Sequence, residues 1–226
     1  DTSDVVISDL PADVPILQIV QPNIPQRDKW RPELQNQHFS LLLEMSRRPD
    51  DLRADQKRIV IWPETAATFF VETQTQARME MAEVLGPDDI LITGAPRTYP
   101  RDTDAYKVWN AIQVIDASGS IVASFDKFHL VPFGEYVPFR SILPFPKLTE
   151  GRTDFSAGPG PQTLSVSGIP SFSPLICTPS ADACARHNSG WVGSSLFASI
   201  SAAVSRTSPL TAPGSSRAFC SSLPNC

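Results

Sequence analysis

Short apolar segments alternate with longer segments of helical periodicity over most of the chain. Residues 16–21 and 58–62 are apolar runs that each stop at a proline, which is typical of strands buried on both faces. Residues 31–48 and 72–85 place apolar side chains every three to four positions and predict helices. Further strands are predicted at residues 89–93, 108–116, 120–124, 162–166 and 172–177.

The order of these elements predicts the fold class. A strand, helix, strand, helix, strand series precedes two pairs of strands, and Ala117-Ser118-Gly119 is a turn typical of hairpins. Alternation of this kind favours an α/β protein in which helices and sheets form separate layers. The 22 prolines also favour strands and loops over long helices.

Composition narrows the class of protein. A chain of 226 residues, 41% of them hydrophobic, can build one domain with a core but not two large ones. The net charge of −5 argues against a nucleic-acid partner, which usually requires a basic surface. No apolar run approaches the ~18 residues that a transmembrane helix needs.

The composition changes after Cys177. Residues 178–226 contain no Glu, Lys or Tyr, and twelve of them are serine. Such a segment has little to bury, so we predict a low-complexity Ser/Ala-rich tail rather than part of a packed core.

The four cysteines fit neither a metal site nor a disulfide framework. They all lie in the last quarter of the chain, without a Cys-x-x-Cys pair and with only His187 nearby. The first 176 residues contain none, which makes a disulfide-stapled secreted domain a weak alternative. We therefore expect no metal and no other cofactor.

Three predicted strands end at residues that could serve catalysis. Glu64 follows residues 58–62, Lys127 follows residues 120–124, and Cys177 ends the last strand. Functional groups gather at the carboxyl ends of strands in open α/β sheets. Taken singly, each has a structural explanation: a helix-start carboxylate, a surface ion pair or a buried inert thiol. Together they supply a general base, a cation for an oxyanion and a nucleophile.

Glu, Lys and Cys in this chain order resemble the nitrilase superfamily. Several sequence words resemble one branch of it, the apolipoprotein N-acyltransferases of the bacterial inner membrane. These words are QIVQPNIPQ at 18–26, Lys29-Trp30, WPETA at 62–66, YKVWN at 106–110 and DKFHLVPFGEYVP at 126–138. The resemblance covers residues 14–177 and implies a nitrilase-like α-β-β-α sandwich.

The resemblance implies a two-step acyl transfer. Cys177 attacks an ester carbonyl of a phospholipid with Glu64 as general base, Lys127 stabilises the oxyanion, and a lysophospholipid leaves. The acyl chain is held as a thioester until the α-amine of a diacylglyceryl-cysteine attacks it. The implied partners are a phospholipid acyl donor, a diacylglyceryl apolipoprotein acceptor and the membrane surface. The implied location is the inner membrane, with this domain facing the periplasm.

Further site residues follow from the resemblance. Glu135 is expected to support Lys127, and Trp30 matches a tryptophan near the substrate entrance. An apolar loop is expected to act as a mobile lid that lies against lipid, although its aromatic side chains could equally be core residues. These aromatic residues are Phe128, Phe133, Tyr136 and Phe139.

The family pattern breaks directly after the nucleophile. Cys177 is followed by Thr178-Pro179, where the family has Tyr-Glu, and the later family block is missing. We interpret residues 178–226 as out-of-frame translation, and residues 1–13 as a linker from an absent transmembrane region. A sandwich that is incomplete at its C-terminus exposes apolar surface and a sheet edge. We therefore expect the chain to fold poorly and to have little activity.

Two other functions remain open on the sequence. A soluble nitrilase-like amidase or carbamoylase would use the same three residues on a small substrate, with water as the acceptor. A non-catalytic module with a degenerate nitrilase fold would explain the lost Tyr-Glu. The loop at 126–138 favours the acyltransferase over the amidase.

Overall fold

The computed structural model describes most of the chain between residues 14 and 176. The described residues are 14–50, 52–100, 107–132, 134–136, 154–174, 176 and 203–204. The domain boundaries that we predicted after residues 13 and 177, and nearly all of the tail, lie outside them.

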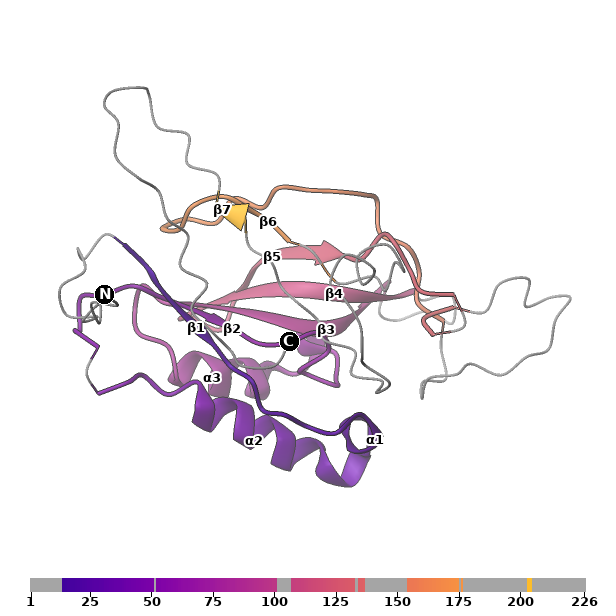
Figure 1. The fold of residues 1–226 in the computed structure, drawn as a ribbon, viewed down its shortest axis with the longest axis horizontal. Helices are drawn as coiled ribbons and strands as arrows, with labels where there is room; N and C mark the ends of the chain where they lie inside the picture. The colour runs from indigo at the N-terminus through magenta and orange to yellow at the C-terminus, as the bar shows by residue number, and fades with distance from the viewer. Residues whose placement is uncertain are drawn as a thin grey trace, which may run out of the picture.

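A five-stranded mixed sheet forms the centre of the described residues (Figure 1). Its strands, in spatial as well as chain order, are β1 (Ile16–Ile19), β2 (Arg58–Ile61), β3 (Ile90–Tyr99), β4 (Lys107–Asp116) and β5 (Ile121–Asp126). The first three pair in parallel, and β3, β4 and β5 pair antiparallel. The mixed α/β class predicted from the sequence is confirmed.

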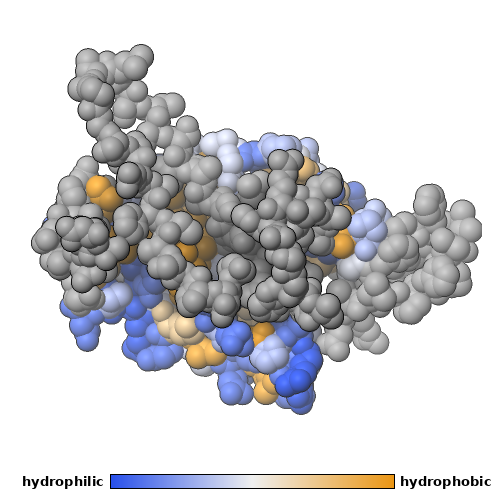
Figure 2. Space-filling model, viewed as in Figure 1, coloured by the Kyte–Doolittle hydropathy of each residue, from blue (hydrophilic) through white to orange (hydrophobic). Residues whose placement is uncertain are grey.

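Two helices cover one face of the sheet. The helix α2 (Gln35–Met45) links β1 to β2, and α3 (Thr75–Glu83) links β2 to β3. Leu42 of α2 and Met81 of α3 pack in a core that includes Val60, Leu91 and residues of neighbouring strands. Figure 2 shows that the edge of the molecule where α2 lies in Figure 1 is mostly hydrophilic, as expected of the outer side of a helix layer. In the described part of the chain, no helix has both the length and the apolar character needed to cross a membrane.

The opposite face of the sheet packs against an irregular segment after residue 154. Leu164 and Phe172 from this segment join Ile59, Ile92 and Phe125 in a second core. Figure 1 shows β6 (Phe172–Ser173) on the side of the sheet away from α2 and α3. The strand β6 pairs antiparallel with β7 (Ala203–Val204). The described residues thus form a helix layer, a sheet and a third layer.

Some predicted bounds were wrong. The helix predicted at 31–48 begins only at Gln35, because Pro32 lies in a preceding 3₁₀ turn, Pro32–Leu34. Likewise, the helix predicted at 72–85 is a 3₁₀ turn, Val71–Thr73, followed by α3.

The strand predicted at 89–93 continues to Tyr99, because the whole of β3 pairs with β4. The strand predicted at 162–166 is reduced to a single bridge, in which Leu164 exchanges both main-chain hydrogen bonds with Phe172. The strand predicted at 172–177 is described only as far as β6 and residues 174 and 176.

A buried ion pair joins the elements at the amino end of β2. Arg58 is fully buried, and its guanidinium donates to Asp89 Oδ2 at 3.0 Å and to Gln18 Oε1 at 2.7 Å. It also donates to the main-chain oxygens of Ser46 at 2.9 Å and Val84 at 2.6 Å. Burial lowers the pKa of Arg58, although the Asp89 carboxylate opposes this shift. One side chain therefore links β1, β2 and the ends of both helices.

Candidate active site

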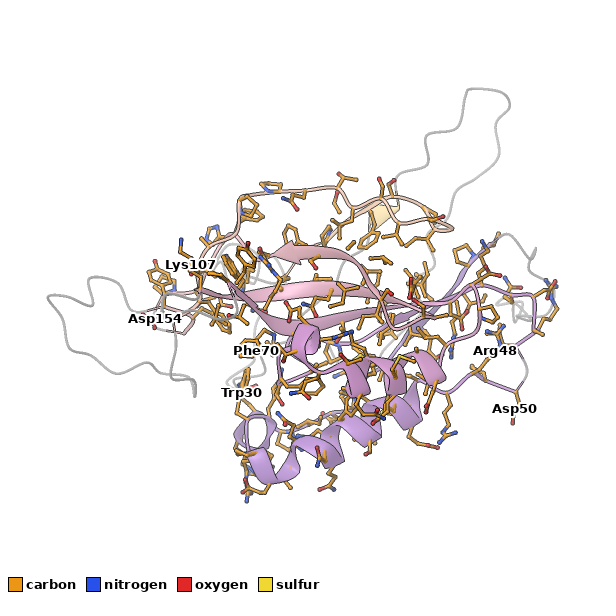
Figure 3. All side chains as sticks on the ribbon, turned by 180° about the vertical axis from the view of Figure 1, so that it is seen from behind. Trp30, Arg48, Asp50, Phe70, Lys107 and Asp154 are labelled. Carbon is orange, nitrogen blue, oxygen red and sulfur yellow. The ribbon has the colours of Figure 1, made fainter. Side chains whose placement is uncertain are left out.

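The carboxyl ends of β1 and β2 lie at the end of the sheet where β3 finishes and β4 begins. Figure 3 shows Trp30, Phe70 and Lys107 toward this end of the molecule, and Arg48 and Asp50 toward the other. The residues that we selected at strand ends should therefore gather here.

Glu64 lies in a turn directly after β2. The preceding Trp62 is fully buried and donates from Nε1 to Ser46 Oγ at 2.7 Å, which anchors the chain on the helix side of the sheet. Thr65 then takes a left-handed conformation, with φ of 48°. This conformation is strained for a β-branched residue. The turn buries the Glu64 side chain to 8% exposure.

Gly94 allows this turn to lie against β3. A Cβ atom at Gly94 would lie 2.5 Å from the Thr65 nitrogen and 2.7 Å from Glu64 Cα. Both contacts are with main-chain atoms and are shorter than packing allows. Ala67 N also donates to Gly94 O at 3.2 Å. The position of Glu64 therefore depends on the missing side chain of Gly94.

Lys127 follows β5 and is buried. Its main-chain nitrogen donates to Asn110 O at 2.8 Å, and its carbonyl accepts from Gly158 N at 2.9 Å. The side chain is 3% exposed, and Nζ lies 3.0 Å from Glu135 Oε2 and 3.5 Å from Glu64 Oε1. Lys127 is thus not the surface ion pair that its position in the sequence also allowed.

Glu135 closes a short turn that begins at Val131. Its main-chain nitrogen donates to Val131 O at 2.9 Å, and its carboxylate accepts from Val131 N at 2.9 Å. Phe155 N donates to the carbonyl of Glu135 at 2.8 Å. These contacts aim the carboxylate at Lys127.

Asn110 joins the two carboxylates and was missed as a site residue in the sequence. Its Nδ2 donates to Glu64 Oε1 at 2.6 Å and to Glu135 Oε1 at 2.8 Å. The side chain is 2% exposed, on the β4 strand. A polar residue among the apolar positions of a central strand was the available signal, because a buried amide needs partners. Glu64, Asn110, Lys127 and Glu135 are called the Glu64 cluster below.

The Glu64 cluster contains two carboxylates and one ammonium, and it carries one net negative charge when all three are ionised. A carboxylate held by an amide and an ammonium is suited to accepting a proton from a nucleophile close by. A buried ammonium can stabilise an oxyanion. Within the described residues, no group of three or more His, Cys, Asp or Glu could hold a metal ion.

The remaining predicted site residues are only partly described. Trp30 is half-buried and directly follows the short helix α1 (Gln26–Lys29). Phe128 packs edge-on against Phe125, with ring centroids 6.3 Å apart, so it contributes to the core. Phe128 and Tyr136 also line a hollow of about 500 Å³, together with His129, Leu130, Phe155 and Ala157. Cys177, Phe133 and Phe139 lie outside the described residues.

Comparison with known proteins places the chain in a family. Residues 17–181 match the family model of carbon-nitrogen hydrolases. The chain belongs to the carbon-nitrogen hydrolase family. This match covers every residue of the Glu64 cluster as well as Cys177.

Curated proteins similar to this chain include apolipoprotein N-acyltransferases. The protein of that name from Bradyrhizobium diazoefficiens is 38% identical over 169 residues, which are 71% of this chain and 32% of the relative. Its namesake from Rhodopseudomonas palustris is 32% identical over 188 residues, 78% of this chain and 35% of the relative. The chain thus spans about a third of the length of these relatives.

Solved structures are more distant. An amidase from Nesterenkonia sp. AN1 is 16% identical, with a TM-score of 0.43, over 72% of this chain and 56% of the amidase. A similarity of this size carries no argument about function.

Proposed function

We propose that this chain carries the catalytic residues of an apolipoprotein N-acyltransferase. The reaction moves a fatty acyl chain from a phospholipid to the N-terminal amine of a diacylglyceryl-cysteine in a bacterial lipoprotein. The observation that carries the proposal is the buried Glu64 cluster at the carboxyl end of β2, within a stretch that is 38% identical to an enzyme of that name. The parent protein would act at the inner membrane, with this domain in the periplasm.

The first half-reaction forms a thioester. Glu64 takes the proton of the Cys177 thiol, and the sulfur attacks the ester carbonyl of the phospholipid. Lys127 faces the negative charge that develops on the carbonyl oxygen. The C–O bond breaks, Glu64 returns the proton to the leaving oxygen, and a lysophospholipid departs.

The second half-reaction forms an amide. The lipoprotein amine attacks the thioester carbonyl, and Glu64 takes a proton from the nitrogen. The C–S bond breaks, and Glu64 returns the proton to the sulfur, which restores the Cys177 thiol. Glu135 holds the Lys127 ammonium in place through both steps, at the 3.0 Å separation between Nζ and Oε2. Asn110 holds Glu64 and Glu135 together.

The sharpest test is the first half-reaction, because departure from the family pattern after Cys177 makes us expect slow turnover. The 226-residue chain is incubated in detergent micelles with a phospholipid whose acyl chain is isotopically labelled, and its peptides are analysed by mass spectrometry. We expect the label on the peptide that contains Cys177, through a thioester bond that neutral hydroxylamine cleaves. The label should be absent in Cys177→Ala and in Glu64→Gln.

Two other results would replace the proposal. Hydrolysis of small amides without acylation by phospholipid would favour the amidase that the family's name also permits. No reaction of Cys177 with either substrate, in a chain that unfolds cooperatively, would favour a non-catalytic module.

A further inference from the structure

The main chain of Glu64 is held by a second lysine. Lys29, the last residue of α1, donates from Nζ to Glu64 O at 2.8 Å, across 35 positions of the chain. An ammonium group is strongly hydrated, so holding it half-buried costs free energy unless nearby groups compensate. The compensating groups here belong to the residue that we propose as the general base.

The Lys29 ammonium lies in the electric field of the Glu64 carboxylate. Burial lowers the pKa of Lys29, and attraction by Glu64 opposes that shift. Glu64 is thus faced by Lys29 from the side of α1 and by Lys127, 3.5 Å away, from the end of β5. Glu135, which carries a like charge, is joined to Glu64 through Asn110.

The turn that carries Glu64 needs support from outside itself. Thr65 is held in a left-handed conformation, and Gly94 supplies contact but no side chain. The carbonyl of Glu64 belongs to the peptide unit that joins Glu64 to Thr65. A hydrogen bond to this carbonyl would fix the orientation of that peptide unit. Lys29 supplies that bond from a different element of the fold.

We propose that Lys29 is a positioning residue for Glu64, which fixes the turn that carries the carboxylate and joins it to α1 and Trp30. The inference rests on the proposed function, since it takes Glu64 as the general base. Lys29 holds the carboxylate within reach of Asn110 and Lys127. The hydrogen bond from Lys29 thereby links the segment that contains Trp30, expected at the substrate entrance, to the turn that carries the proposed base.

Kinetic tests compare Lys29→Met and Lys29→Arg with Arg27→Met. Arg27 lies on the same helical turn with its side chain 85% exposed, so it is a matched control for charge. We expect Lys29→Met to slow acylation of Cys177 at least tenfold, with KM for the phospholipid changed less than twofold. Lys29→Arg recovers part of the rate, and Arg27→Met stays within twofold of the parent chain.

Thermal unfolding separates positioning from a merely structural role. The cost of burying the Lys29 ammonium is offset by its interactions with Glu64, so replacing it with Met should change the melting temperature by little more than the loss of one hydrogen bond. A loss of rate that disappears when the rate is expressed per folded molecule would overturn the proposal. So would an unchanged rate in Lys29→Met.

A titration tests the contact without relying on acyl transfer. The five lysines of the chain are labelled with ¹³C at Cε, and Lys29 is assigned by its absence in Lys29→Arg. We expect Lys29 to titrate below the ordinary pKa of a lysine side chain, and at still lower pH in Glu64→Gln, because burial lowers the pKa of Lys29 and Glu64 opposes that shift. Identical curves for Lys29 in both chains would overturn the proposal. If the titration of Lys29 depends on Glu64 but Cys177 is never acylated, the positioning contact stands and the proposed function is wrong.

Discussion

Asn110 donates a hydrogen bond of 2.6 Å from its side-chain amide to Oε1 of Glu64, across 46 residues of the chain. The same nitrogen donates to Oε1 of Glu135 at 2.8 Å. A neutral amide has two N–H groups, so one side chain can serve both carboxylates. The proposed base and its supporting carboxylate are therefore held at a fixed separation by β4.

Replacing Asn110 with Leu should remove this link while keeping a similar volume. Two buried carboxylates each lose a donor, so we expect stability to fall by about 1–3 kcal/mol. We expect acylation of Cys177 to slow by about 10²–10³. Rapid-quench mass spectrometry measures the rate, and urea unfolding measures the stability.

The matched control is Gln113→Leu on the same strand. Gln113 is fully buried on the other face of β4, and its side-chain amide has no hydrogen-bond partner. An apolar replacement should keep the acylation rate and maintain or raise the stability. Equal rates in Asn110→Leu and Gln113→Leu would contradict the role given to Asn110.

Removing the Lys127 ammonium should destabilise the fold and stop the reaction. In Lys127→Met, the buried carboxylates of Glu64 and Glu135 lose their shared cation, at a cost of about 3–5 kcal/mol. Adding Glu135→Gln removes one of the uncompensated charges, so the double variant should recover part of the stability but no acylation. Urea unfolding of the four chains in this cycle gives the coupling. A double variant less stable than Lys127→Met would refute the shared-cation arrangement.

Gly94→Ala should displace the proposed base. The added methyl group meets the main chain of Glu64 and Thr65 at 2.5–2.7 Å, so the turn must move. We expect a loss of about 1–3 kcal/mol of stability from overpacking. We expect about a 10²-fold slower acylation from the misplaced carboxylate.

Gly119→Ala provides the comparison for Gly94→Ala. Gly119 lies in the β4–β5 hairpin, at the other end of the sheet, with φ of 76°. An alanine there is strained and lowers stability by about 1 kcal/mol, but the acylation rate per folded molecule should not change. Equal loss of rate in both variants would show that rate merely follows stability.

Arg58→Met should be among the most destabilising single substitutions in the chain. It leaves Asp89 buried with one cation fewer and removes the donors to two main-chain oxygens, which predicts a loss of about 3–5 kcal/mol. The control is Arg47→Met, whose exposed pair with Glu44 should contribute less than about 0.5 kcal/mol. The measurement is the urea midpoint of unfolding of Arg58→Met and of Arg47→Met. Similar midpoints in the two variants would contradict the prediction.

Asp116 should make stability depend on pH in the acid range. Burial alone would raise the pKa of Asp116, but hydrogen bonds from the Ser118 hydroxyl and the main-chain nitrogens of Ser120 and Ser118 outweigh it and lower the pKa. The ionised form is therefore favoured in the fold. Its contribution is present above the ordinary pKa of 3.8 and is lost as the pH falls through the lower folded value.

The measurement compares the parent chain with Asp116→Asn between about pH 5 and pH 2. The parent should lose more stability over this range than the variant does. The difference should be less than about 1 kcal/mol, since the Asp116 side chain is partly exposed and solvent screens its charge. A steeper loss in Asp116→Asn would show that the sign is wrong.

The sequence was most informative about site residues whose position can be located from the neighbouring residues in the chain. Glu64 and Lys127 could be selected because each directly follows an apolar strand, and a strand's end can be located from its own residues. The two partners of Asn110 are 46 and 25 positions away, so its role becomes visible only when the strands pair. For the same reason the full length of β3 could not be predicted, since its second half is set by pairing with β4.

The pairing of β4 with β5 also affects where Lys127, the proposed oxyanion-stabilising cation, lies relative to the proposed base. The bond from Lys127 N to Asn110 O continues the ladder one step beyond the pair Ala111 and Asp126. A slip of one residue would turn the lysine side chain to the opposite face of the sheet. The position of Lys127 relative to Asn110, and through Asn110 to Glu64 and Glu135, therefore follows from the register of β4 and β5.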